Sequence, residues 1–131
     1  MGTYMRTITT LTALAGLLSL SLSACGDNGN LGQAAGVLSE HYTAHPPPHG
    51  WTVEAVNPER DTDKLVVEVL ISSDADIQRI KMLSRMEQFT VAKLACPEMT
   101  PALRTAIGAK VRVWVQLKTA KEILTASICP E

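Results

Sequence analysis

Apolar and polar residues alternate along three stretches of the chain, and a fourth stretch, residues 64–72, is apolar on both of its faces, which is typical of a central strand. These patterns predict four β-strands. In one of them the odd-numbered positions from Val111 to Leu117 are apolar, which predicts a strand with one covered and one open face. In another, the even-numbered positions from Leu124 to Ile128 are apolar and are expected to face the core. The four stretches are residues 51–56, 64–72, 110–118 and 122–129.

Apolar residues at steps of three and four predict helices in the rest of the chain. A short peripheral helix is expected over residues 31–42, and the run of prolines that begins at Pro46 prevents it from continuing. One long helix is expected from the cap residue Ser73 to about Leu94, packed on one face of the sheet. A further short helix is expected over residues 102–107.

These elements predict one small α+β domain in the order β-β-α-β-β. The four strands are expected to form a mixed or antiparallel sheet, and the pattern leaves their order in the sheet open. The net charge of the whole chain is −1, so no basic excess indicates a nucleic-acid partner.

The N-terminal segment has a different pattern, a continuous apolar run without alternation. Arg6 precedes residues 8–22, which contain no charge and no proline, and small residues follow. This is the pattern of a secretory signal, and the run is shorter than the about 20 apolar residues that a spanning helix needs. Residues 22–25, Leu-Ser-Ala-Cys, resemble the lipobox of bacterial lipoproteins. The alternative is an ordinary secretory signal in which the cysteine occurs by chance.

The resemblance implies cleavage just before Cys25 and attachment of diacylglycerol to its thiol. It divides the chain into a cleaved signal peptide (1–24), a lipidated Cys with a flexible tether (25–32) and the folded domain (33–131). It also implies a bacterial cell envelope, on the outer side of the inner membrane or the periplasmic face of the outer membrane. An Asp directly after the Cys is an inner-membrane signal in enteric members of this class. Gly26 holds that position here, which favours the outer membrane in a cell with two.

The cysteine count changes once Cys25 carries a lipid. The chain has three cysteines, so Cys96 and Cys129 remain. Exported compartments are oxidising, and the two are therefore predicted to form one disulfide.

No stretch of the chain carries a recognisable catalytic or cofactor motif. A Gly-x-Ser-x-Gly turn, a His-Glu-x-x-His pair and a phosphate-cradling glycine loop are all missing from the sequence. We therefore expect no enzyme activity and no cofactor. The three histidines, His41, His45 and His49, are spaced by four and are weighed as metal ligands against a surface turn with incidental histidines.

The candidate interface is Trp114 with its neighbours Arg112 and Gln116 on the outward side of their strand. Exposed Trp beside Arg is typical of interface anchors, although a covering by the N-terminal helix explains the Trp equally well. The leading hypothesis is a membrane-anchored, non-enzymatic interaction or assembly module of an envelope complex, with a protein partner. The alternatives are a small ligand- or metal-binding lipoprotein that uses the histidine segment, and an immunity or inhibitor lipoprotein.

Overall fold

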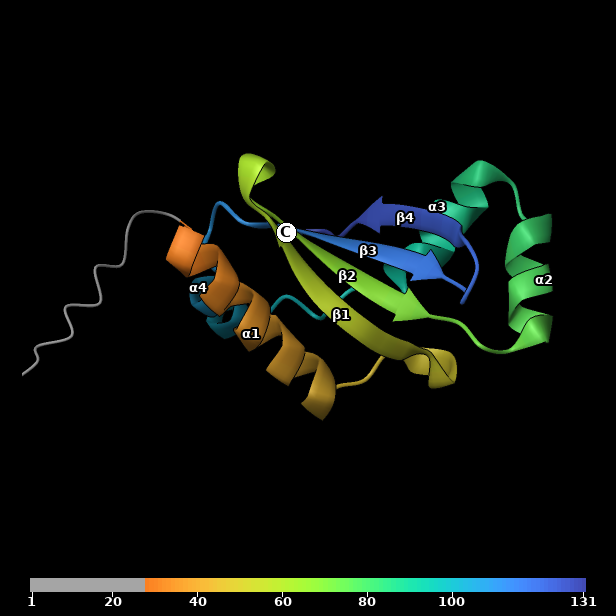
Figure 1. Ribbon diagram of the computed structural model, residues 1–131, viewed down its shortest axis with the longest axis horizontal. Helices are drawn as coiled ribbons and strands as arrows, with labels where there is room; N and C mark the ends of the chain where they lie inside the picture. The colour runs from red at the N-terminus through yellow and green to blue at the C-terminus, as the bar shows by residue number, and fades with distance from the viewer. Residues whose placement is uncertain (1–27) are drawn as a thin grey trace, which may run out of the picture.

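The computed structural model describes residues 28–131, in which one four-stranded sheet is covered on one face by α-helices, while α2 (Asp74–Met82) lies beyond the ends of the strands (Figure 1). The predicted α+β class with a mixed four-stranded sheet is confirmed. The helices are α1 (Asn28–Ala44), α2 (Asp74–Met82), α3 (Arg85–Lys93) and α4 (Pro101–Ile107), with short 3-10 turns η1 (Pro48–Gly50) and η2 (Arg60–Thr62). The strands are β1 (Thr52–Glu59), β2 (Lys64–Leu70), β3 (Arg112–Lys118) and β4 (Ile123–Ile128).

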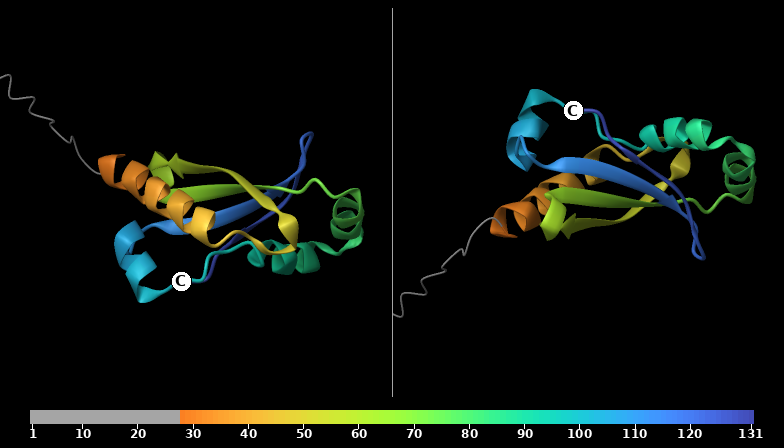
Figure 2. Two further views of the ribbon diagram at one scale, coloured as in Figure 1. Left: turned by 90° about the horizontal axis from the view of Figure 1, so that it is seen from below. Right: turned by 90° about the horizontal axis from the view of Figure 1, so that it is seen from above.

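The sheet order is β1-β2-β3-β4, with two antiparallel hairpins joined through a parallel pair at the centre. Parallel strands cannot be joined by a tight turn, so the chain must cross over between β2 and β3. It does so through α2, α3 and α4. Figure 2 shows α3 and α4 together on one side of the sheet. The core lies between the sheet and this helical layer, where Leu65, Val67 and Val115 are fully buried.

The expected long helix is two helices, so that prediction is wrong. Leu83, after the end of α2, has an extended backbone with φ −74° and ψ 152°. Ser84 then begins α3 with a capping box: its hydroxyl accepts from the Glu87 N–H, and its own N–H donates to the Glu87 carboxylate at 2.8 Å. The apolar period continues across this break, but a Ser followed by Glu three residues later is a start signal for a new helix.

The N-terminal helix is neither short nor peripheral, which corrects a second prediction. α1 has 17 residues and packs against β1, β2 and α4. Leu31, Ala34 and Leu38 on its inner face are at most 4% exposed. α1 begins at Asn28, inside the range 25–32 that the sequence assigns to a tether, and the first turn of the helix already carries core residues.

The inward side of β4 after Leu124 is the opposite of the one predicted. Thr125 and Ser127 are buried towards the helices, and Ala126 and Ile128 lie on the other face. Leu124, at the irregularity in the β3–β4 pairing, packs against the core as predicted. Cys129 determines which residues of β4 face inward, because it must point into the helical layer to meet Cys96. Side chains alternate along a strand, so Ser127 and Thr125 point to the same side as Cys129.

The Sγ atoms of Cys96 and Cys129 lie 2.05 Å apart, the distance of a disulfide bond. The bond joins the turn after α3 to the residue after β4. It thereby ties the last strand, which lies at the edge of the sheet, to the helical layer. None of the helices over residues 28–131 combines the length and the apolar character that crossing a bilayer requires.

Removal of this disulfide is expected to destabilise the domain by about 3–4 kcal/mol, the chain-entropy cost of a loop of this length. The two cysteines are 33 residues apart. The measurement is urea unfolding of the chain with the double change Cys96→Ser and Cys129→Ser, compared with the oxidised protein. Two free thiols in the native oxidised protein, measured by mass spectrometry after alkylation, would contradict the bond.

Candidate functional site

One face of the sheet carries no helix, and we call it the open face. Strand register places three apolar side chains in a line across it, because Val66 pairs with Trp114 and Trp114 pairs with Ile128. We call these three residues the apolar row. Val66 and Trp114 are half-buried and Ile128 is 39% exposed. An apolar line across an uncovered sheet face is a surface that can contact another molecule.

Charged residues bound the apolar row on one side. Lys64 pairs with Arg112 in register, and each lies two residues before the apolar row on its strand. The Lys64 Nζ is 3.1 Å from a carboxylate oxygen of Glu59 and 4.8 Å from the centre of the Trp114 ring, a cation–π distance. Arg112 is exposed and takes part in no ion pair among residues 28–131. This end of the open face, the basic end, therefore has an excess positive charge.

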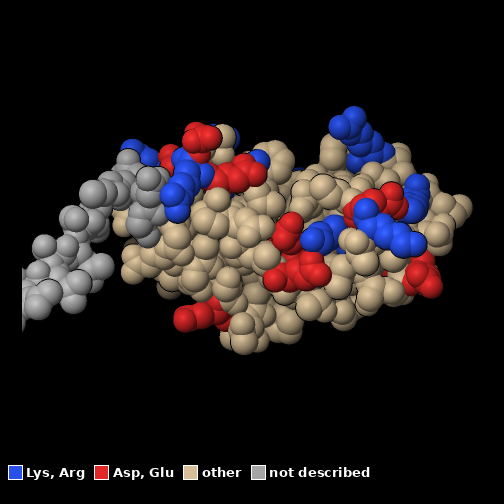
Figure 3. All heavy atoms as spheres, in the orientation of Figure 1, with Lys and Arg blue, Asp and Glu red and all other residues tan. Residues whose placement is uncertain are grey.

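On the other side of the row lies the acidic end, formed by Glu54, Glu68 and Lys118. The Lys118 Nζ is 2.9 Å from a carboxylate oxygen of Glu54 and 3.6 Å from one of Glu68. The hydrogen bond to Glu54 is the main cause that raises the pKa of Lys118. Two carboxylates share one ammonium group, so the cluster of Glu54, Glu68 and Lys118 carries one excess negative charge. Figure 3 shows uncharged surface between two groups of charged side chains on this side of the molecule.

The structure brings the predicted interface residues Arg112, Trp114 and Gln116 together on the open face of β3. The alternative, a Trp114 covered by the N-terminal helix, does not hold, because α1 packs on the opposite face of the sheet. Val66 and Ile128 were missed as members of this surface. β2 is apolar on both of its sides, so its pattern does not single out Val66, and the pattern of β4 predicts Ile128 on the inward side. Only the register between the strands reveals that the two residues line up with Trp114.

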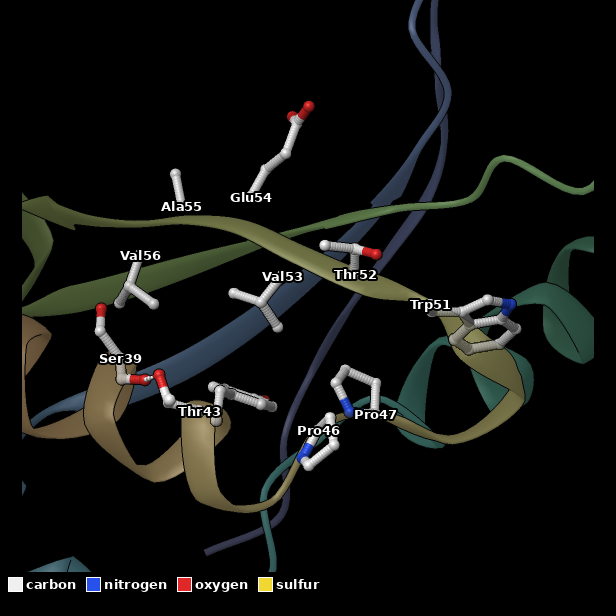
Figure 4. Close-up of a pocket in the computed structure, with 11 residues that line it drawn as sticks. Ser39, Thr43, Pro46, Pro47, Trp51, Thr52, Val53, Glu54, Ala55 and Val56 are labelled. Carbon is white, nitrogen blue, oxygen red and sulfur yellow. Dashed lines mark hydrogen bonds between the residues drawn. The ribbon is translucent and has the colours of Figure 1, made fainter.

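A second surface is a groove of about 380 Å³ between α1 and β1 (Figure 4). Val53 and Val56 point from β1 towards α1, whereas Glu54 points away. On the helix side, the Thr43 hydroxyl donates to the backbone oxygen of Ser39 at 3.0 Å. β1 pairs only with β2, so its outer edge carries unpaired backbone groups. The sequence could not indicate this groove, because its second wall is the helix that was expected to be peripheral.

The three candidate metal ligands do not converge. The ring of His41 on α1 stacks at 4.7 Å on that of His45, the residue after the end of the helix. His49 lies after the prolines, and its ring is 5.3 Å from that of Trp51. No group of three or more His, Cys, Asp or Glu within residues 28–131 is arranged to hold a metal ion. Cys25, the predicted lipidation site, lies outside the described residues.

The histidine pair makes stability depend on pH. Burial lowers the pKa of His41 from its ordinary value, the charge of His45 lowers it further, and the carboxylate of Glu98 acts in the opposite direction. The unfolded chain keeps the ordinary pKa of about 6.5 and therefore takes up the proton first as the pH falls. The contribution of His41 to stability is thus fully present above that pH and is lost as the pH falls through the lowered pKa of the folded state.

We expect the free energy of unfolding to decrease between pH 7 and pH 5 more steeply in the wild type than in His41→Gln. The measurement is urea unfolding at several pH values. Ser39→Ala, a change on the same helix that alters no titratable group, is the control and should leave the slope unchanged. Equal slopes for the wild type and His41→Gln would contradict the assigned role of His41.

The chain was compared with models of known protein families, with curated protein sequences and with solved structures. None of the three comparisons finds a significant match. The assignment of function therefore rests on the lipobox-like segment, the open face and the chemistry of the side chains on it.

Proposed function

We propose that this protein is a lipid-anchored interaction module of a bacterial cell envelope, without enzymatic activity of its own. The N-terminal resemblance to a lipobox supports the location, with the lipid on Cys25. α1 begins only three residues after that Cys. A domain attached so closely stays near the bilayer surface, where it meets other membrane-associated proteins at a raised effective concentration.

The open face is the contact surface in this proposal, and the apolar row is the observation that carries it. Trp and Arg are the side chains most often found at the energetic centre of interfaces, and Trp114 lies between Arg112 and Gln116 on β3. Trp114 also has an amphipathic environment, with the Lys64 ammonium over its ring. A partner that covers this ring would remove the largest side chain of the open face from water.

The anchoring part of the proposal predicts that Cys25→Ala moves the protein from the membrane fraction to the soluble fraction of the envelope. The physical reason is that, in this proposal, the thiol of Cys25 supplies the covalent link to lipid. Fractionation followed by immunodetection measures the distribution, and Asn30→Ala, a change in the same segment, is the control that stays membrane-bound. Unchanged membrane association of Cys25→Ala would contradict a lipid on this residue.

The interaction part predicts that Trp114→Ser removes most cross-linked products of the full chain in intact membranes, by about tenfold or more for a central interface residue. Met82→Ser is the matched control, because Met82 is an exposed apolar residue, 85% accessible, on α2 and not on the open face. The yield is measured by immunoblot after amine cross-linking. Equal losses in the two variants, or no loss in either, would refute the open face as the contact surface.

A further inference from the structure

The two ends of the open face carry opposite excess charges at the same distance from the apolar row. Arg112 lies two residues before Trp114 on β3, and Glu68 lies two residues after Val66 on β2. The cation has no ion-pair partner among the described residues, while Glu68 shares Lys118 with a second carboxylate. A partner surface that satisfies both ends needs the same apolar centre and the reversed order of charges.

We propose that the partner is a second copy of this chain, packed face to face through the open face about a two-fold axis that runs along the apolar row. This proposal rests on the proposed function, because it names the partner of the same surface. A two-fold axis along the row keeps each strand opposite its own copy and reverses the strand direction. The row then meets the row, with Trp114 opposite Trp114 of the second copy.

The same operation brings the basic end of one copy over the acidic end of the other. Lys64 of one copy comes opposite Glu68 of the other, and Arg112 comes opposite Gln116, the neighbour of Glu68 on the next strand. The reverse contacts form by symmetry. Sheets packed face to face lie about 10 Å apart, a gap that an Arg and a Glu side chain span together. Both excess charges are therefore compensated by one symmetric contact.

The other face-to-face arrangement is disfavoured by charge. An axis parallel to the strands, between β2 and β3, would place Lys64 opposite Arg112 of the second copy and Glu68 opposite Gln116. Like charges directly opposite each other repel, and the excess negative charge would stay uncompensated. The charge pattern thus selects antiparallel packing of the two sheets.

The size of the surface determines where such a dimer forms. Four strands about 4.8 Å apart and about six residues at 3.4 Å each cover roughly 400 Å² per copy. Two copies would bury on the order of 800 Å², below the about 1,200 Å² of stable complexes. The contact is therefore weak in dilute solution and depends on the lipid anchors. A two-fold axis along the membrane normal holds both copies of Cys25 at one height above the same bilayer.

The test uses the full chain in intact membranes, with Ile128→Cys as a reporter on the apolar row. Cys96 and Cys129 are bonded to each other, and Cys25 is consumed by lipid, so the new thiol reacts alone. A short thiol-to-thiol cross-linker is expected to yield a species of twice the monomer mass. Thr105→Cys, exposed on α4 at the opposite side of the molecule, is the matched reporter that should yield at least threefold less.

Charge reversal then separates a specific dimer from random encounter. Adding Arg112→Glu to Ile128→Cys should lower the dimer yield about three- to tenfold, the range for exposed charge pairs made twice across the axis. Adding Gln116→Arg as well should restore it, because residue 116 of one copy lies opposite residue 112 of the other. Equal yields from the two reporters, or no effect of Arg112→Glu, would overturn the dimer.

The closing experiment distinguishes failure of the dimer from failure of the proposed function. A photo-reactive thiol reagent on Ile128→Cys traps any neighbour of the open face. A species of twice the monomer mass supports the dimer. A product with a different protein, identified by mass spectrometry, overturns the dimer and leaves the interaction module standing. No product at all overturns both.

Discussion

The parallel pairing of β2 with β3 is the constraint on which the rest of the structure depends. After β2 the chain leaves one end of the sheet and must return to the opposite end, where β3 begins beside the start of β2, and this requires a long crossover. α2, α3 and α4 form that crossover. α3 and α4 lie with α1 on one side of the sheet, and α2 lies beyond the ends of the strands. The opposite face receives no cover from the described chain. The open face is thus a consequence of the strand order.

The disulfide and the capping box adjust how this single helical layer meets the sheet. The Ser84 cap lets the chain turn between α2 and α3, so that α3 can lie along β4. Ala92 and Ala95, both at most 2% exposed, leave room for this close approach. The bond from Cys96 to Cys129 then holds the edge strand under the helices. Because the same bond determines which residues of β4 face inward, it also turns Ile128 outward and completes the apolar row.

Local pattern was a good guide to the strands and a poor guide to how elements meet. The alternation from Val111 to Leu117 correctly predicts which side of β3 is covered, since every second residue there is apolar. On β4 the same argument failed, because two small polar residues, Thr125 and Ser127, are buried while Ile128 is not. The long-helix prediction failed at Ser84, where apolar periodicity was preferred over a capping signal that was present in the sequence.

The sequence by itself determined the α+β class, the four strands, the segment that resembles a lipobox and the placement of Arg112, Trp114 and Gln116 on one side of a strand. These follow from side-chain periodicity and local chemistry, which act over a few residues. Only the tertiary structure decided the strand order, the integral role of α1, and the alignment of Val66 with Trp114 and Ile128. That alignment depends on register between strands that are distant in sequence, and the packing of the whole core selects it.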